Sequence, residues 1–318
     1  MNKTARELVS GQQVEWVRPD DLVDQAFQKM AKHDLTALPV VEPSTGTAPG
    51  AIKGFVDVVD LVAFLANVGT RIMTNPYGAG ESRSIATDDV AILHRRSKEF
   101  RITNTVEISD YCKRNPLHKV NQNMSTKDLI NFFGKSNEYI HRVAVVDDNH
   151  NLIGVLTQSM LLRCIHGDLS QMREINDLKA GSLRMTEVNK LATVPADMVA
   201  FDAFMTMHKE GLSSLAVVSG NGEIFENISA TDLKGALTDF KRLLLSVRDY
   251  LAVTRAVVIG KKRAEGLVYC EREKSLVEVM NRINETRVHR LYVVDEQRKP
   301  VGVVSLTDIC HSLQRVIA

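Results

Sequence analysis

The strongest constraint on what this chain can fold into is a short apolar strand pattern that occurs four times. The pattern ends in two valines in every copy, and the copies begin at Leu38, Val143, Leu215 and Leu291. A turn, a second apolar strand and the start of a helix follow each copy. Four units with the same hydrophobic order indicate a repeat protein in which each unit is one supersecondary structure.

The spacing inside the units is as regular as their hydrophobic pattern. One position near the start of the following helix lies 17 residues after the start of the pattern in the last three copies and 22 residues after it in the first. The longer first interval comes from extra residues in its turn, around positions 44–49. The residues at this helix position are Asp60, Met160, Asp232 and Asp308.

The length of 318 residues fits two compact domains, each made from two units. A unit of roughly 60 residues is close to the lower limit for a stable core, so the units are expected to pair. The predicted boundaries are 1–67 for repeat one, 68–104 for an irregular insert, 105–167 for repeat two, 168–180 for a linker, 181–240 for repeat three and 247–318 for repeat four. The predicted fold class is α/β, built from α+β repeats.

Composition argues against several classes of protein. With 44% hydrophobic and 25% charged residues, the chain is typical of a globular protein, and its net charge of +1 argues against a nucleic acid as the main partner. The longest apolar run, Leu61–Val68, is too short to span a bilayer, and no signal peptide is visible. We therefore expect no membrane association and a cytoplasmic or nuclear location.

The cysteines predict neither a zinc site nor a disulfide framework, because they lie far apart and form no CxxC pair. They are Cys112, Cys164, Cys270 and Cys310. Their expected role is that of small buried residues in a reducing compartment. No metal and no cofactor are predicted.

Local patterns predict individual elements of the first and last units. The last unit should contain strands over Leu291–Val294 and Val301–Val304 and a helix from Leu306. The first unit should contain a strand over Val14–Val17 and a helix over Leu61–Asn67.

Two basic stretches lie outside this pattern. We interpret His94–Arg101 as the solvated face of a helix in preference to a binding patch. The run Lys261–Arg263 fits a solvated loop and a phosphate-facing loop equally well.

Hydroxyl residues and an aspartate come together where the second strand ends and the helix begins. Unit four has Ser305, Thr307 and Asp308, and unit three has Ser229 and Asp232. Backbone N–H groups at a helix start favour an anion such as phosphate, and a carboxylate can accept hydrogen bonds from a ribose diol. The same residues are common helix caps that need no ligand. Recurrence of the aspartate in three units favours ligand binding.

A His-Arg pair opens the strand in two of the units. The pairs are His141-Arg142 and His289-Arg290. Arginine presents a planar fork that suits phosphate, and histidine adds a donor. At equivalent positions the two pairs could converge on one charged centre. The alternative is that they are exposed residues at the entry of a strand.

No catalytic motif is present. A P-loop, a GxGxxG after a strand, HExxH, GxSxG and the kinase HRD and DFG motifs are all missing from the sequence. The sequence therefore predicts a binding protein rather than an enzyme.

These features together resemble the CBS domain family, named after cystathionine β-synthase. The last unit carries the resemblance most clearly, with VHRLYVVD followed by GVVSLTDI. Four such repeats in one chain are similar to the γ subunits of AMP-activated protein kinase and their yeast nutrient-sensing relatives. The resemblance implies β-α-β-β-α repeats that pair into two Bateman modules and form a disc.

The resemblance also implies binding sites for AMP, ADP or ATP, each built across paired repeats. One site would combine Asp308, Ser305 and Thr307 with Ala192, Leu212 and Ser213. A second would combine Asp232 and Ser229 with Val288, His289 and Arg290. A third would combine Asp60 with Ile140, His141 and Arg142.

Several positions depart from the family pattern. Thr36 stands where the family has a phosphate-contacting arginine, and Asp57 stands where it has a serine or threonine. Ser159 and the loop Gly260–Arg263 each replace a basic residue. A carboxylate at Asp57 would repel phosphate, so the site around Asp60 is expected to be impaired.

The resemblance implies a non-catalytic regulatory subunit that binds adenine nucleotides and senses energy state for a protein kinase complex. One alternative is a CBS-fold scaffold, or a regulator of kinases or phosphatases, with decayed nucleotide sites. Another is a CBS module for a different adenosyl ligand such as S-adenosylmethionine. The His-Arg pairs argue against that ligand, because it has no phosphate.

Overall fold

The computed structural model describes residues 3–42, 51–73, 84–103, 116–135, 140–169, 173–183, 191–236, 239–257 and 267–317. Cys112 and the basic loop 260–263 lie outside these ranges.

Each repeat is built on an antiparallel hairpin. The hairpins are β1 (Ala37–Val41) with β2 (Ile52–Asp57), β4 (Arg142–Val146) with β5 (Leu152–Thr157), β7 (Ser214–Val218) with β8 (Ile224–Ser229), and β10 (Arg290–Val294) with β11 (Pro300–Ser305). In the last three repeats a short strand adds in parallel to the first hairpin strand. These strands are β3 (Lys119–Asn121), β6 (Thr193–Pro195) and β9 (Tyr269–Glu271). The predicted strands of the last unit are thereby confirmed.

Repeat one lacks a full third strand. Val17 makes a single parallel bridge to Val40, so the strand predicted over Val14–Val17 is wrong. Val17 uses both backbone groups, donating to the Pro39 carbonyl and accepting from the Val41 N–H. The ladder does not extend back toward Val14 because Pro39 stands where Ala144 and Ala216 donate to the residue before the short strand, and it does not extend forward because Pro19 also has no N–H.

Helices surround the four sheets. They are α1 (Ala5–Leu8), α2 (Val23–Lys32), α3 (Val58–Met73), α4 (Thr87–Ser97), α7 (Thr126–Phe133), α8 (Gln158–Leu169), α9 (Arg173–Asp177), α11 (Ala200–Glu210), α12 (Val247–Val257), α13 (Leu276–Thr286) and α14 (Leu306–Ile317). Short 3₁₀ helices span Ala180–Ser182, Ala230–Ala236 and Phe240–Leu244. The start of α14 at Leu306 is as predicted.

The first unit is more helical than its sequence predicts. The helix expected over Leu61–Asn67 begins at Val58 and continues to Met73, with buried residues on nearly all of its sides. It continues into the segment 68–104, for which the sequence predicts irregular structure and which also contains α4. Within α4, Arg95 and Arg96 are exposed and pair with Glu99, which confirms the interpretation of that basic run as a solvated face.

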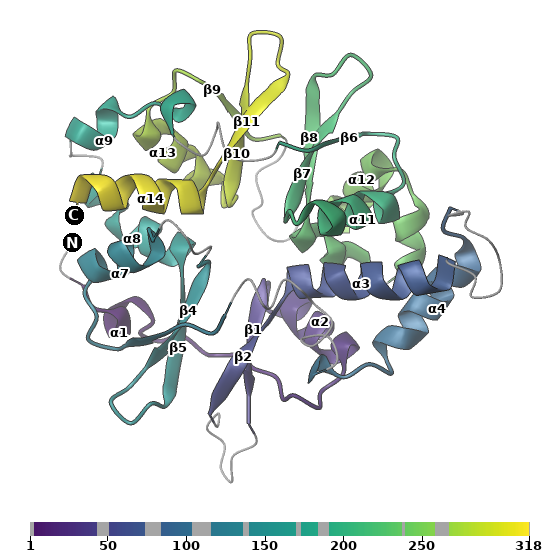
Figure 1. The fold of residues 1–318 in the computed structure, drawn as a ribbon, viewed down its shortest axis with the longest axis horizontal. Coiled ribbons are helices and arrows are strands. Elements are labelled where there is room, and N and C mark those ends of the chain that lie inside the picture. The colour runs from purple at the N-terminus through teal and green to yellow at the C-terminus, as the bar shows by residue number, and fades with distance from the viewer. Residues whose placement is uncertain are drawn as a thin grey trace.

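The four repeats form a ring, seen in Figure 1 down the shortest axis of the molecule. The sheets of repeats one and two meet through an apolar cluster that includes Val41 and Ala144, and those of repeats three and four through one that includes Ala216 and Tyr292. The chain therefore forms two paired modules, one from the first two repeats and one from the last two.

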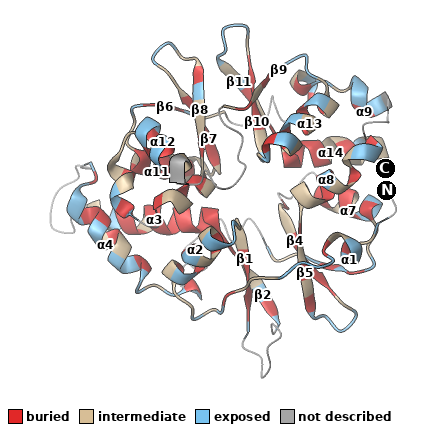
Figure 2. Ribbon diagram, turned by 180° about the vertical axis from the view of Figure 1, so that it is seen from behind, coloured by how far each residue is buried: buried red, intermediate tan, exposed pale blue. Residues whose placement is uncertain are grey.

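The helices join the two modules to each other. One core combines helices of repeats one and three, with α3 packed on α11. The other combines helices of repeats two and four, with α14 packed on α7 and α8. In Figure 2 the buried positions follow α3 and α14. Each repeat thus buries its sheet against one neighbour and its helices against another.

The segments that lead into the repeats cross over within each module. The first residues of repeat one pack on repeat two. Thr4 bridges Ser125, and the Ala5 N–H donates to the Met124 carbonyl over 2.8 Å. The reciprocal bridges are Leu22 to Arg101, Lys179 to Ser275 and Val199 to Ser246. Neither repeat of a module is complete without the lead-in of the other.

The crossover can be tested at Gly154. A Cβ at this position would lie 2.5 Å from Cβ of Val9, which belongs to the N-terminal lead-in. We expect Gly154→Ala to lower the free energy of unfolding by about 1–3 kcal/mol, the usual cost of overpacking a core. Urea denaturation of Gly154→Ala, Val9→Ala and the double variant measures the coupling. Val9→Ala keeps the Val9 Cβ but removes Cγ1 and Cγ2, which would lie 2.9 and 2.6 Å from the new Cβ. Fewer atoms then have to move, so the double variant should lose less stability than the sum of the two single changes. Additive losses would contradict the contact.

Candidate functional site

The starts of the four repeat helices are fixed by one recurring hydrogen bond. The first helical N–H donates to the carbonyl of the residue that precedes the first hairpin strand. The pairs are Val58 to Thr36, Gln158 to His141, Ala230 to Ser213 and Leu306 to His289, at 3.0–3.2 Å. This bond holds the strand-entry residue of each repeat beside the start of its own helix, which is where the sequence predicts the sites.

The three repeated aspartates turn back to cap the end of the preceding strand. Oδ2 of Asp308 accepts from the N–H and the hydroxyl of Ser305 at 2.6 and 2.7 Å. Oδ2 of Asp232 accepts from the same groups of Ser229 at 2.8 and 2.7 Å. Burial raises the pKa of Asp308, and the two bonds from Ser305 oppose that rise. The cap role is therefore fulfilled without a ligand, and a ribose would have to bind a carboxylate that is already held in place.

Repeats three and four join at Arg290 and Ser213, two residues that the sequence places in adjacent sites. Nη2 of Arg290 donates to Oγ of Ser213 over 2.6 Å. In the part of the chain that the structure describes, no carboxylate lies within 4.0 Å of this guanidinium. Arg290 is thus held by a neutral hydroxyl, and its charge reaches Asp308, whose pKa it helps to lower.

The equivalent arginine of repeat two has a different partner. Nη1 of Arg142 donates to Oδ2 of Asp57 over 2.7 Å, and both side chains are nearly buried, with 13% and 4% of their surface exposed. Asp60 lies one helical turn away, and its Oδ2 accepts from the Asp57 N–H. The sequence predicts that Asp57 impairs this site by repelling phosphate. The structure adds that Asp57 also binds the arginine that a phosphate would use.

His141 lies among the charged residues of this region. Its pKa is lowered to about 4, chiefly by burial and then by the charge of Arg142, while the charge of Asp57 acts in the opposite direction. The more distant charge of Arg290 also lowers it, so the His-Arg pairs of repeats two and four do influence one another. His141 is neutral at pH 7. His289, by contrast, has an exposed side chain.

Thr307 occupies the interface between repeats two and four. Its side chain is buried and exchanges hydrogen bonds with the Gln158 amide at 3.2 and 3.3 Å. A phosphate-donor role for Thr307, which the family resemblance implies, would require this pair to open. Gln158 was not predicted. Its position at the first residue of α8, equivalent to Leu306, is the signal that would have identified it.

The remaining predicted residues are mainly apolar and partly buried. Ala192 and Leu212 pack on the core of repeats one and three, and Val288 and Met160 pack on the core of repeats two and four. Ile140 is buried in the second core. The contact of these residues with a nucleotide stays a prediction.

A buried bond links the two sheets of the second module. Oγ of Ser214 and the hydroxyl of Tyr292 lie 2.9 Å apart, and both side chains are buried. The sequence analysis missed it, although Tyr292 stands where the other repeats have Pro39, Ala144 and Ala216. The bond lies next to the Arg290–Ser213 contact and holds the two strand entries together.

The described cysteines are free. Cys270 and Cys310 are buried, and burial raises the pKa of the Cys270 thiol to about 12, whereas Cys164 is partly exposed. The described ranges contain no group of three or more His, Cys, Asp or Glu residues placed to hold a metal ion.

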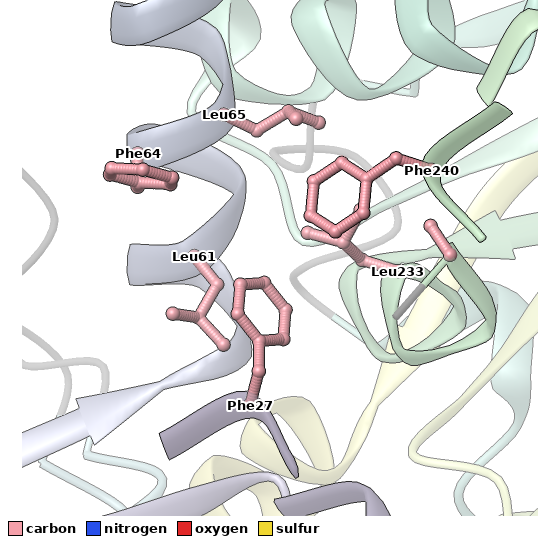
Figure 3. A pocket seen from close by; sticks show the side chains of 7 residues that line it. Phe27, Leu61, Phe64, Leu65, Leu233 and Phe240 are labelled. Atoms are coloured by element: carbon pink, nitrogen blue, oxygen red, sulfur yellow. The ribbon is translucent and has the colours of Figure 1, made fainter. Parts of the chain in front are cut away.

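A small cavity lies between repeats one and three, and its lining includes Leu61 and Leu233, which follow Asp60 and Asp232 in the chain. Its lining is apolar and consists of Phe27, Leu61, Phe64, Leu65, Leu233, Ala236 and Phe240 (Figure 3). Such a lining offers no donor to a phosphate, so we treat the cavity as a packing defect of the helical core.

The matches to known sequences identify the family. The sequence model of the CBS domain matches residues 5–67, 108–167, 180–239 and 262–315. Together with the four described sheets, these matches show that the chain belongs to the CBS domain family and contains four CBS repeats.

Two groups of relatives are similar to this chain in sequence. Protein SDS23 of Kluyveromyces lactis is 25% identical over 331 residues, covering 92% of this chain and 58% of SDS23. The human 5'-AMP-activated protein kinase subunit gamma-3 is 30% identical over 276 residues, covering 79% of this chain and 54% of the subunit. The chain therefore spans somewhat more than half the length of these relatives.

Solved structures confirm the fold. A Methanocaldococcus jannaschii protein, proposed to be an archaeal homologue of g-AMPK, has a TM-score of 0.67 at 16% identity and covers 98% of this chain and 100% of its own. A conserved protein from Pyrococcus horikoshii has a TM-score of 0.53 at 14% identity, covering 99% and 100%. Among the described helices, none is both long and apolar enough to cross a membrane.

The lowered pKa of His141 predicts a pH dependence of stability. An unfolded histidine has a pKa of about 6.5. Between that value and about 4, the unfolded chain binds a proton that the folded chain does not, so the free energy of unfolding should fall as the pH falls through this window. In His141→Gln this contribution is absent. Urea denaturation at pH 7 and pH 5 should therefore show a smaller loss for the variant than for the wild type. The control His150→Asn, at an exposed histidine, should behave as the wild type does, and an equal loss in all three proteins would refute the assignment.

Proposed function

We propose that this chain is a non-catalytic regulatory protein that binds an adenine nucleotide, AMP, ADP or ATP, in the clefts between repeats three and four. The observation that carries the proposal is the state of Arg290. A guanidinium held by the neutral hydroxyl of Ser213 lies beside two helix starts that each bear a Ser-x-x-Asp cap. A cation next to helix N-termini favours a phosphate, and the aspartates offer acceptors to a ribose.

The expected binding geometry divides the ligand into two ends. The ribose hydroxyls would donate to Asp308 in one cleft and to Asp232 in the other, and the phosphates would point toward Arg290 and Ser213. His289, which is exposed at the same strand entry, is expected to add a donor. The cleft around Asp60 is not part of this proposal, because Arg142 is bound to Asp57.

The kinase-subunit relative supports a regulatory role. Human gamma-3 is named as a subunit of a protein kinase, and we propose that this chain likewise acts on a kinase or another regulatory protein, in the cytoplasm or the nucleus. A ligand can bias such a partner only if it binds two states of the protein with different affinities. The two clefts of the second module share Arg290 and Ser213. These two residues would therefore distinguish ligands that carry one, two or three phosphates.

Calorimetric titration with AMP, ADP and ATP tests the proposal directly. We expect mutually competitive binding in the micromolar range, about −8 kcal/mol. Asp308→Asn should weaken AMP by about 1.5–3 kcal/mol, because the amide cannot accept from both ribose hydroxyls as the carboxylate does. The matched variant Asp60→Asn should leave the affinity unchanged. An equal effect of both changes, or none from Asp308→Asn, would remove the ribose assignment.

A second candidate function is a scaffold or a kinase or phosphatase regulator without nucleotide sites. The Arg142–Asp57 pair favours it, because the arginine of the predicted site around Asp60 is already paired with an acid. Such a protein would give no heat with any of the three nucleotides. Comparing the thermal shift caused by AMP with that caused by S-adenosylmethionine separates a third candidate: a larger shift with the ligand that lacks phosphate would overturn the role assigned to Arg290.

A further inference from the structure

The Asp57 carboxylate is held by the donors of an anion site. Oδ1 accepts from the N–H groups of Val59 and Asp60 at the start of α3, at 2.8 and 3.1 Å. Oδ2 accepts from the Arg142 guanidinium at 2.7 Å. Two helix N-terminal amides and one arginine are what a bound phosphate would use in such a place. Here the acceptor is a side chain of the protein itself, and only 3% of Asp57 is exposed.

The second module provides an internal comparison. The strand registers pair Ala37 with Asp57 and Ser214 with Ser229, so Asp57 of repeat one is equivalent to Ser229 of repeat three. Arg142 and Arg290 are equivalent by the same criterion, since each opens its hairpin strand opposite the last residue of the second strand. The two modules therefore have the same arginine at the same place. In the first it pairs with Asp57; in the second the equivalent residue is Ser229, whose hydroxyl donates to Asp232, and Arg290 donates to Ser213 instead.

We propose that Asp57 is a built-in anion that occupies the phosphate position of the first module and thereby closes it to nucleotides. The chain carries its own ligand in one module and leaves the other for a diffusible phosphate compound. Asp57 thus determines which module responds. The inference rests on the proposed function only for the choice of AMP as the probe, because the ion pair itself is a property of the protein.

A reciprocal exchange of the two residues tests the proposal in the full chain. Asp57→Ser gives repeat one the residue found in repeats three and four, and should release Arg142 and add one AMP site to the stoichiometry of the wild type. Ser229→Asp should place a carboxylate against Arg290 and weaken AMP binding in the second module at least tenfold. Asp57→Asn is a second variant that keeps an oxygen acceptor for the helix amides while removing the charge that pairs with Arg142. Circular dichroism and a cooperative melt check that each variant is folded.

The outcomes separate this inference from the proposed function. A site gained by Asp57→Ser in a chain whose wild type binds nothing would support the inference and refute the proposed function. A wild type that binds AMP, together with an Asp57→Ser and an Asp57→Asn variant that gain no site, would overturn the inference and leave the proposed function intact. No AMP binding by the wild type and by both Asp57 variants would overturn both.

A ligand-free measurement addresses the ion pair independently. Thermal melts of Asp57→Asn, Arg142→Gln and the double variant give the coupling of the two charges. We expect the two single changes to lower Tm and the double change to lower it by less than their sum. Each single change leaves the other nearly buried charge without its partner. The control pair Arg290→Gln and Ser229→Ala in the second module should be additive. Additivity at Asp57 and Arg142 would refute the claim that the carboxylate is held as a ligand.

Discussion

A CBS repeat has two apolar surfaces, and neither can be buried within the repeat. One is the sheet face, with residues such as Ala144 and Ala216, and the other is the helical face, with fully buried residues such as Leu61 and Leu129. Burial of a large aliphatic side chain contributes roughly 1.5–3 kcal/mol. The ring satisfies both surfaces at once, since sheets pair within a module and helices pair between modules. The positions of the strand entries and helix starts follow from this double burial.

The part of the fold that recurs could be predicted from the sequence. The strand pattern of the last unit and the helix from Leu306 were found because the polar turn and the 17-residue interval recur in three copies. The crossover of the lead-in segments could not be found, because Thr4 and Ser125 are related by no local pattern and pair only through the tertiary structure. For the same reason the sequence missed the full length of α3, whose extension includes the buried residues Val68 and Gly69, with Gly69 against Phe201 of α11.

For the candidate site, residue types were predictable and partners were not. The sequence identified Arg142, Arg290, Ser213 and Asp57 as chemically important. It treated the two arginines as equivalent, because position and identity are the same in both repeats. The difference lies in what each guanidinium contacts, a carboxylate in one module and a hydroxyl in the other. Those contacts join residues 77 and 85 positions apart, so only the tertiary structure reveals them.

The energetics of the Asp57–Arg142 pair favour a closed first module over a weakened one. Removing one member of a nearly buried pair typically costs about 3–5 kcal/mol, because the other charge is left uncompensated. A free nucleotide that displaced Asp57 would have to offset that cost and also the loss of its translational and rotational freedom, about 4–15 kcal/mol. A carboxylate on the same chain loses no such freedom on binding, since it is ordered when the protein folds. Under the proposal, the asymmetry between the modules comes from the source of the anion, which is a side chain of the protein in one module and a solute in the other.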